Sequence, residues 1–197
     1  MRKTAILLSA YSPNNADVRM LSMYNHIAYC TKWGFSFISI NEPYSPYIPC
    51  SVVESLLSEY EHVVLIGTDI LITDFDKDLR EFSRKAITIQ DEGTGSVNGD
   101  FIIFNDRLTI KLLSAQLSSP KYGASQYAIN DMNTEHISIL PPRTMQSISP
   151  IGNENRPELQ YLLWQESDFS IHFHQPKKSP SVKEKITAMK KFMEMYK

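Results

Sequence analysis

One acidic residue, Asp69, interrupts an apolar, strand-forming run that extends over residues 62–72. Its carboxylate would lie at the end of a buried strand, where an isolated charge is costly unless it is paired. A cation is an economical partner there, and a metal ion that carries a phosphate group is one such cation. The position therefore predicts a site that binds a cation together with a phosphorylated ligand.

The elements that must position Asp69 alternate between helices and short apolar strands. A first helix is expected from about residue 15 to a glycine stop at Gly34, with Met20, Tyr24 and Ile27 recurring at helical spacing. Strands are expected over residues 3–10, 35–40, 62–72, 86–89, 101–105, 137–140 and 169–173. This alternation predicts an α/β sandwich with a mostly parallel central sheet.

Ligands of such sheets bind beyond the carboxyl ends of the strands. Ser12 follows the first expected strand, Asp69 lies within the run 62–72, and Asn98 precedes a later strand. We therefore expect these three residues to line one crevice.

Length and charge limit the possible classes of protein. The 197 residues suffice for one domain with a short appendage, and the net charge of -2 argues against nucleic acid as the main partner. No apolar run is long enough to span a bilayer, so no transmembrane segment is expected. Cys30 and Cys50 lack metal-ligand spacing; free thiols in a reducing compartment are favoured over a disulfide. A soluble, cytoplasmic protein is expected, either a compact viral or bacterial protein or the first domain of a longer one.

Five segments, in order, resemble the retaining α-galactosyl, xylosyl and mannosyltransferases of the GT-A fold, together with the related galactosyltransferase and glycogenin group. They are residues 25–37, 63–72, 96–105, 125–130 and 172–178. The resemblance implies a GT-A (Rossmann-like) α/β/α sandwich over residues 1–178, followed by a basic amphipathic helix over 179–197. Three positions depart from the family pattern: Gly67 replaces the first Asp of Asp-X-Asp, Ser125 replaces an Asp, and Gln175 replaces a common Gly.

The resemblance implies a divalent cation, Mn²⁺ or Mg²⁺, held by Asp69 and His172. Oxygen ligands with one imidazole suit these ions. Asp69 has an alternative role as a turn-forming or capping residue, and His174 is an alternative to His172 as the metal ligand. Because Gly67 removes one carboxylate, we expect weaker or less selective metal binding rather than none.

The resemblance also assigns residues to the donor and to the reaction. Gln126 would lie beside the anomeric carbon and steady an oxocarbenium-like charge, whereas Asp100 is the stronger nucleophile chemically. Asn98 and Asp91 would bind hydroxyls of the donor sugar. The other expected donor contacts are Tyr11 and Ser12 at the base and ribose, and Lys177 and Lys178 at the diphosphate. Several of these residues have a structural alternative: core packing for Tyr11, an exposed helix start for Gln126, an ordinary loop acid for Asp91, and the start of a basic tail for the lysines. Strand alternation could also point Asp100 away from the site.

The implied activity is transfer of a hexose or pentose from a nucleotide-diphosphate sugar, with UDP favoured, to a glycan or glycoprotein acceptor with retention of configuration. A degenerate domain that binds nucleotide-sugar or glycan without turnover is the alternative, and Gly67 is its main support. A sugar nucleotidylyltransferase would carry a glycine- and arginine-rich loop after the first strand. Residues 11–15, Tyr-Ser-Pro-Asn-Asn, contain neither residue type, which disfavours that class.

Overall fold

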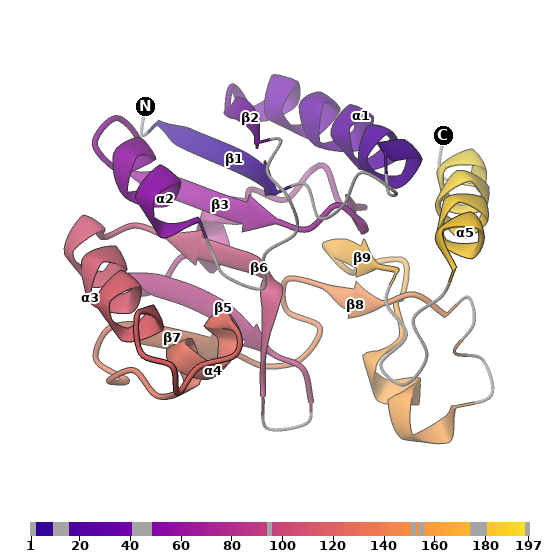
Figure 1. Ribbon diagram of the computed structural model, residues 1–197. Helices are drawn as coiled ribbons and strands as arrows, with labels where there is room; N and C mark the ends of the chain where they lie inside the picture. Colours follow the sequence, from indigo (N-terminus) through magenta and orange to yellow (C-terminus); the bar gives the residue numbers. More distant parts are fainter. Residues whose placement is uncertain are drawn as a thin grey trace.

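A six-stranded sheet forms the centre of the molecule, in the order β2-β1-β3-β6-β5-β7 (Figure 1). The computed structural model describes residues 3–9, 16–40, 49–93, 96–150, 153, 156–173 and 181–195. The strands are β1 (Thr4–Ser9), β2 (Ser36–Ile40), β3 (His62–Ile66), β5 (Ile87–Asp91), β6 (Val97–Phe104) and β7 (Ile137–Leu140). All pairings in this sheet are parallel except those of β6, which runs antiparallel to β3 and β5. The predicted α/β architecture with a mostly parallel sheet is confirmed.

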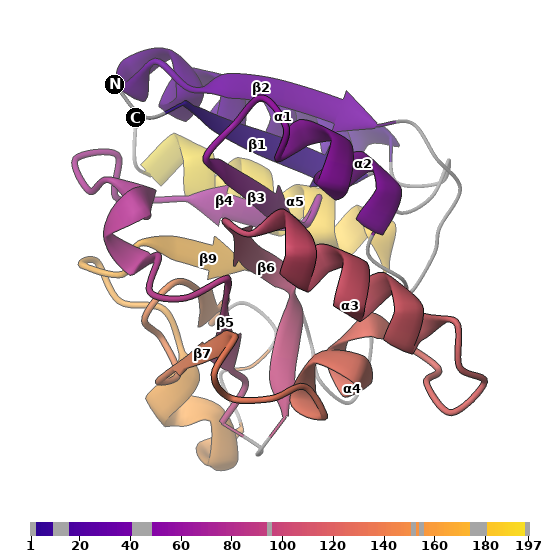
Figure 2. The same ribbon diagram turned by 90° about the vertical axis from the view of Figure 1, so that its left-hand side faces the viewer.

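Helices cover both faces of this sheet. One face carries α2 (Cys50–Leu56), α3 (Arg107–Leu117) and α4 (Ser125–Asn130), which stand in front of the sheet in Figure 2. The other face carries α1 (Ala16–Trp33) and the short 3-10 helix η2 (Leu79–Phe82). None of the helices in the described ranges is both long and apolar enough to cross a membrane.

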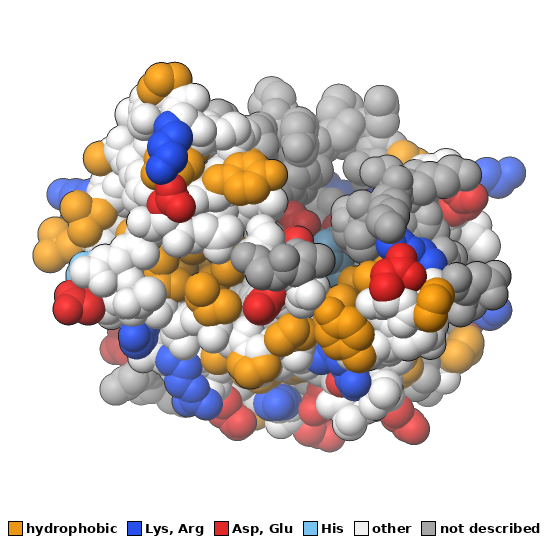
Figure 3. Space-filling model, turned by 90° about the horizontal axis from the view of Figure 1, so that it is seen from below, with side chains coloured by type: hydrophobic (Ala, Val, Ile, Leu, Met, Phe, Trp, Pro, Cys, Tyr) orange, Lys and Arg blue, Asp and Glu red, His pale blue; other side chains and the backbone are white. Residues whose placement is uncertain are grey.

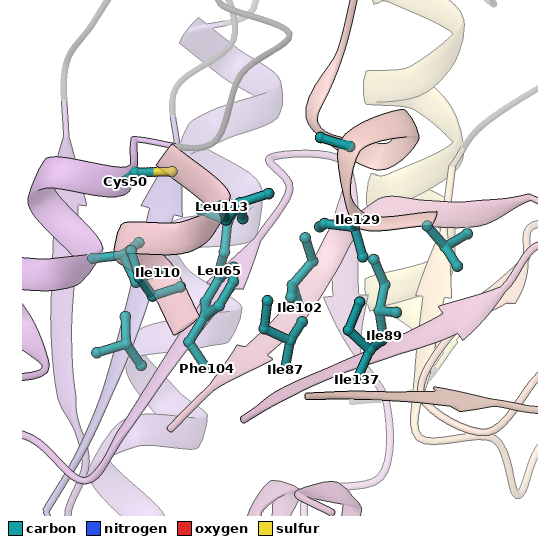
Figure 4. Packing of buried hydrophobic residues seen from close by; sticks show 14 of the residues in the cluster. Cys50, Leu65, Ile87, Ile89, Ile102, Phe104, Ile110, Leu113, Ile129 and Ile137 are labelled. Carbon is teal, nitrogen blue, oxygen red and sulfur yellow. The ribbon is translucent and has the colours of Figure 1, made fainter. Parts of the chain in front are cut away.

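Side chains of the central strands alternate between two hydrophobic clusters because successive strand residues point to opposite faces. Leu65, Ile102 and Phe104 point toward α2, α3 and α4, where they meet Ile110, Leu113 and Ile129 (Figure 4). Their chain neighbours Val64, Ile66, Phe101 and Ile103 belong to the cluster on the other face, together with Tyr29 and Cys30 of α1. Burial on both faces explains why these strands are continuously apolar in the sequence. Cys30 and Cys50 are buried free thiols.

A second, three-stranded sheet lies beside the first in the order β4-β9-β8. It consists of β4 (Ile70–Ile72), β8 (Ser147–Ile148) and β9 (Ser170–His172), and the 3-10 helix η3 (Pro157–Leu162) connects β8 to β9. The run 62–72, expected as one strand, is thus two strands in different sheets. The break falls at residues 67–69, which places Asp69 in the turn between them.

Two side chains of α1 hold β4 in position. Asn25 makes two hydrogen bonds with the backbone of Ile72, at 2.9 and 2.8 Å, as a neighbouring strand would. His26 Nε2 donates to the carbonyl of Ile70 at 3.0 Å. One edge of β4 therefore pairs with β9 and the other with polar side chains of α1, which fixes the turn before it.

The C-terminal helix α5 (Val182–Met195) packs against α1 (Figure 1). Ala188, Met189 and Phe192 form a third cluster with Val18, Leu71, Ile171 and Phe173. The ring centroid of Phe192 lies 5.0 Å from that of Trp164. This packing brings the first turn of α5 toward the turn that carries Asp69.

Candidate functional site

Three acidic or basic side chains from separate segments meet at the carboxyl end of β3. Asp69 lies in the turn after β3, and Asp100 lies on β6. The carbonyl of Asp100 accepts a 2.7 Å hydrogen bond from the amide of Gly67. His172 ends β9 and pairs with Ile70. Its Nε2 atom is 3.4 Å from Asp69 Oδ1 and 3.7 Å from Asp100 Oδ2. Seen from below, acidic and histidine side chains show at the bottom of a hollow on this face (Figure 3).

A fourth charged side chain, Lys185, enters this cluster from the first turn of α5. Its ammonium group donates to Asp69 Oδ2. The side chains of Lys185 and Asp69 are only 16% and 17% exposed. Lysine is rarely buried unless it is paired, so the contact with Asp69 is what makes this position tolerable.

The charges of the cluster stabilise one another. Burial acts to raise the pKa of Asp69, but His172 and Lys185 outweigh burial and hold that pKa well below its usual range. Burial acts to lower the pKa of His172, yet Asp69 and then Asp100 raise it above the usual value. Asp69 is therefore ionised and His172 is biased toward its protonated form.

These residues, as arranged, do not fit a divalent metal ion. Within the described ranges, no group of three or more His, Cys, Asp or Glu side chains is placed so that it could hold one. The ammonium of Lys185 already contacts the carboxylate of Asp69 and would have to move before a metal ion could bind that carboxylate. The positive charge at Asp69 comes from side chains of this chain.

Gln126 lies against β6 at Gly99, the residue that precedes Asp100. A Cβ atom built on Gly99 would be 3.7 Å from Gln126 Oε1 and 3.8 Å from Gln126 Cβ. The absence of a side chain at Gly99 is what lets this amide approach the strand. The preceding residue Ser125, which stands where the family has an acid, is buried and begins α4.

Asn98 and Asp91 both bond to nearby backbone. Asn98 Oδ1 accepts from the amide of Asp100 at 2.8 Å, which helps to hold Asp100 in place. Asp91 Oδ1 accepts from the amide of Gly93 at 2.6 Å, the local turn contact expected of an ordinary loop acid. Both residues nevertheless line one cavity with His172.

That cavity lies between the ends of β5 and β6 and the segment that contains β8 and η3. Polar residues Asp91, Glu92, Asn98 and Gln146 line one part, and Ile148, Leu159 and Leu162 line another. The Gln146 side chain is buried, and neither its Oε1 nor its Nε2 has a hydrogen-bond partner within the described part of the chain. Burial, followed by the charge of Asp100, raises the pKa of Glu92. Mixed apolar and polar walls are typical of a small-molecule site.

Several predicted site residues lie outside the described residues. These are Tyr11, Ser12, Lys177, Lys178 and the alternative ligand His174. Of the other predicted residues, the structure brings Asp69, Asp100 and His172 into contact distance, sets Gln126 against Gly99, and places Asn98 and Asp91 in the adjoining cavity.

Three further residues of this region, Lys185, Glu92 and Gln146, were not predicted from the sequence. A signal for Lys185 exists: it precedes Ala188, Met189 and Phe192 by three, four and seven residues, so it lies on the buried stripe of α5. Glu92 is the neighbour of Asp91 in the sequence. Gln146 lies in a segment without a recognisable pattern, and nothing in the sequence pointed to it.

No model of a protein family matches the chain, and no curated protein matches it by sequence. Solved structures do match. A glycosyltransferase involved in glycosylation of the major capsid of PBCV-1 superposes with a TM-score of 0.71 at 13% identity, over 96% of this chain and 99% of that one.

Two other sugar transferases match with lower TM-scores. The glycosyltransferase GlyE of Streptococcus pneumoniae gives a TM-score of 0.55 at 10% identity, over 99% of this chain and 64% of that one. The galactosyltransferase LgtC, solved in complex with donor and acceptor sugar analogs, gives 0.52 at 9% identity, with 95% of each chain covered. Together with the sheet order and the reversed strand β6, these likenesses show that the chain has the GT-A glycosyltransferase fold.

Proposed function

We propose that this chain transfers a hexose or pentose from a nucleotide-diphosphate sugar to a glycan or glycoprotein acceptor, with retention of configuration. One observation carries the proposal. Asp69, Asp100 and His172, which three separate sequence segments supply, meet at the carboxyl end of β3, with Gln126 against the neighbouring residue Gly99. The resemblance implies donor-site roles for Asp69, His172 and Gln126, and Asp100 has the chemistry of a nucleophile.

The reaction breaks the bond between the anomeric carbon and the diphosphate oxygen. A new bond forms from that carbon to the acceptor hydroxyl, whose proton passes to the departing diphosphate. The amide oxygen of Gln126 would steady the oxocarbenium-like charge on the face opposite the leaving group. Asp100 offers a second route, in which its carboxylate attacks the sugar first and a second substitution restores the configuration.

The departing diphosphate needs positive charge beside it. The resemblance implies a divalent ion on Asp69 and His172, but these residues as arranged do not fit one, so the metal requirement stays a prediction. A different source of positive charge is Lys185, which already contacts Asp69. Lys177 and Lys178 stay candidates for further contacts to the diphosphate, as Tyr11 and Ser12 do for the base and ribose.

The cavity beside His172 is where we place the sugar. The side-chain amide of buried Gln146, which has no partner among the described residues, can exchange hydrogen bonds with a hydroxyl. The carboxylates of Asp91 and Glu92 can accept others. Leu159 and Leu162 offer apolar surface to a ring face. Asn98 lies on the wall nearest Asp100, as expected for a residue that contacts the donor sugar.

Release of nucleoside diphosphate tests the proposal. The protein is incubated with UDP-glucose, UDP-galactose, UDP-xylose or GDP-mannose, with and without Mn²⁺, and free UDP or GDP is measured over time. We expect slow hydrolysis of at least one donor, and its loss in Asp69→Asn. Asp76→Asn is the matched control, because Asp76 is an exposed acid whose side chain is 93% accessible. If none of the donors is cleaved, alone or with added sugar acceptors, the enzymatic proposal is wrong.

A domain that binds nucleotide-sugar without turnover is the second candidate. Gly67 in place of an acid and the ion pair between Lys185 and Asp69 favour it. Tight binding of UDP or GDP by calorimetry without any donor cleavage would select this candidate over the first.

A further inference from the structure

We propose that Lys185 supplies the cation of this site: its ammonium bridges Asp69 and the diphosphate of the donor, so that donor binding needs no metal ion. This inference rests on the proposed function and assigns a role to a residue of α5 that lies outside the five segments on which the family resemblance rests. It begins from the contact between the ammonium group and Asp69 Oδ2.

The position of Lys185 is fixed by the structure of α5. Ser181 and Glu184 form a capping box at the start of this helix, in which the Ser181 amide donates to Glu184 Oε2 at 2.7 Å and the Glu184 amide donates to Ser181 Oγ at 3.3 Å. The amide of Lys185 then makes the first helical hydrogen bond, to the carbonyl of Ser181 at 3.0 Å. The start of the helix, and with it the origin of the lysine side chain, is thereby defined.

The buried face of α5 directs this side chain inward. Ala188, Met189 and Phe192 anchor the helix against β4 and β9, and Lys185 lies on the same stripe one turn earlier. A lysine at a position suited to an apolar residue costs desolvation and is stabilised here by Asp69. Other lysines of the helix, such as Lys183, Lys190 and Lys191, are exposed.

An ammonium group can serve two anions at once. It carries three N–H donors, and one of them reaches Asp69 Oδ2. The remaining donors can contact phosphate oxygens, for which lysine acts as a compact point charge. A divalent ion would supply the same positive charge to the diphosphate. When the bond from the anomeric carbon to the phosphate oxygen breaks, the charge that grows on that oxygen would lie beside the ammonium group.

Binding of UDP and GDP, measured by calorimetry in EDTA and again in Mn²⁺, tests the inference. The wild-type protein is expected to bind one of them with similar affinity in both buffers. Lys185→Met keeps the length of the side chain and removes the charge, and should weaken binding roughly tenfold or more. Lys190→Met, on the exposed side of the same helix, is the control and should change affinity less than about twofold.

A double variant separates contact with the diphosphate from mere neutralisation of Asp69. If Lys185 contacts the phosphates, Lys185→Met combined with Asp69→Asn should stay as weak as Lys185→Met alone. If the lysine only neutralises the carboxylate, the double variant should regain wild-type affinity, and the inference is overturned. Tighter binding by Lys185→Met would equally overturn it, because the lysine would then obstruct the site.

The wild-type measurement alone decides the matter if Lys185→Met fails to fold, as judged by circular dichroism. If nucleotide binding is lost in EDTA and restored by Mn²⁺, the role of Lys185 is disproved and the proposed function is unaffected. If no nucleotide binds in either buffer and no donor is cleaved, the role of Lys185 and the proposed function are both disproved.

Discussion

At the scale of single residues, Gly67 is the position where the chain departs most clearly from the pattern it resembles. A Cβ atom there would lie 3.3 Å from Asp100 Cβ and 3.5 Å from Asp69 Oδ1. Its backbone is not in the left-handed region, which among the described glycines only Gly34 and Gly93 occupy. An aspartate at Gly67 would therefore require only a small local shift and would point its carboxylate at two others.

Gly67→Asp, made together with Lys185→Met, is expected to create a metal site. Three neighbouring carboxylates without the competing ammonium suit Mn²⁺, and we expect its affinity to rise roughly tenfold or more over wild type. Titration of free Mn²⁺ by electron paramagnetic resonance measures this. Gly67→Asn with Lys185→Met controls for the added bulk. Equal Mn²⁺ affinity in the aspartate and asparagine variants would show that residue 67 does not face the cation position.

Gln126 and Asp100 give the two reaction routes different outcomes. If the amide steadies the transition state, Gln126→Ala should lower kcat roughly a hundredfold and leave KM for the donor nearly unchanged. If Asp100 forms a covalent intermediate, Asp100→Ala should be inactive, and added azide should restore turnover as a glycosyl azide of inverted configuration. Steady-state kinetics and proton NMR of the product distinguish the routes. We expect the loss in Gln126→Ala and no azide rescue of Asp100→Ala.

At the scale of elements, α1 buries a different face from the one the sequence suggested. Met20 and Tyr24 are 51% and 63% exposed, whereas His26 and Tyr29 are fully buried. The polar atoms of this face bond to backbone: His26 to Ile70, and the Tyr29 hydroxyl to the carbonyl of Lys77 at 2.7 Å. The hydrophobic pattern predicted that the face with Met20 and Tyr24 would be buried, and that prediction was wrong. The buried face carries polar side chains because the helix covers strand edges and turns whose carbonyls need hydrogen-bond donors.

Buried His26 should make stability depend on pH. Burial lowers its pKa from 6.5 to about 4, so the unfolded chain binds the proton more readily between these values. The stabilisation is present above pH 6.5 and is lost as pH falls toward 4, by about 3 kcal/mol for a shift of this size. Urea unfolding of wild type and His26→Gln across this range measures the loss. The His26→Gln variant should lose less stability than wild type as pH falls across this range. An unchanged pH dependence in His26→Gln would contradict the assignment.

The anchoring of α5 gives a second prediction at this scale. Phe192 is 7% exposed and packs on Trp164 and Phe173, with ring centroids 5.0 and 6.1 Å apart. Phe192→Ala should lower the free energy of unfolding by about 3 kcal/mol and weaken nucleotide binding, because Lys185 depends on this helix. Met195→Ala on the exposed end should do neither. Chemical denaturation and calorimetry make the two measurements; weaker folding with unchanged nucleotide binding would show that α5 does not position the site.

At the scale of the whole molecule, the site exists because two sheets meet. The central sheet supplies Asp100, the small sheet supplies His172, and the turn that links β3 to β4 supplies Asp69. The antiparallel strand β6 brings Asp100 next to Gly67 at the carboxyl end of β3. If β6 ran parallel to β3, its first residues would lie beside the amino end of β3 and far from Asp69.

Asp168 holds the small sheet together and tests this arrangement. Its carboxylate accepts hydrogen bonds from Arg143 at 2.8, 3.0 and 3.2 Å, from Ser147 Oγ at 2.6 Å and from the Gln165 amide at 2.8 Å. Asp168→Ala leaves these donors unpaired and should cost about 3 kcal/mol in unfolding free energy. Asp76→Ala removes an exposed ion pair with Lys32 and should leave the unfolding free energy nearly unchanged. Similar costs for both variants by urea unfolding would show that Asp168 does not join the segments.

The sequence by itself determined the alternation of strands and helices, because burial on both faces demands continuous apolar runs such as 62–66 and 101–104. Its motifs also indicated Asp69, Asp100, His172 and Gln126 as candidate residues for glycosyl transfer. Only the tertiary structure decided that the run 62–72 splits between two sheets, that Asp100 faces His172, and that Lys185 reaches Asp69 across 116 positions of the chain. Contacts between distant segments follow from how helices and sheets pack, and local residue patterns carry no record of that packing.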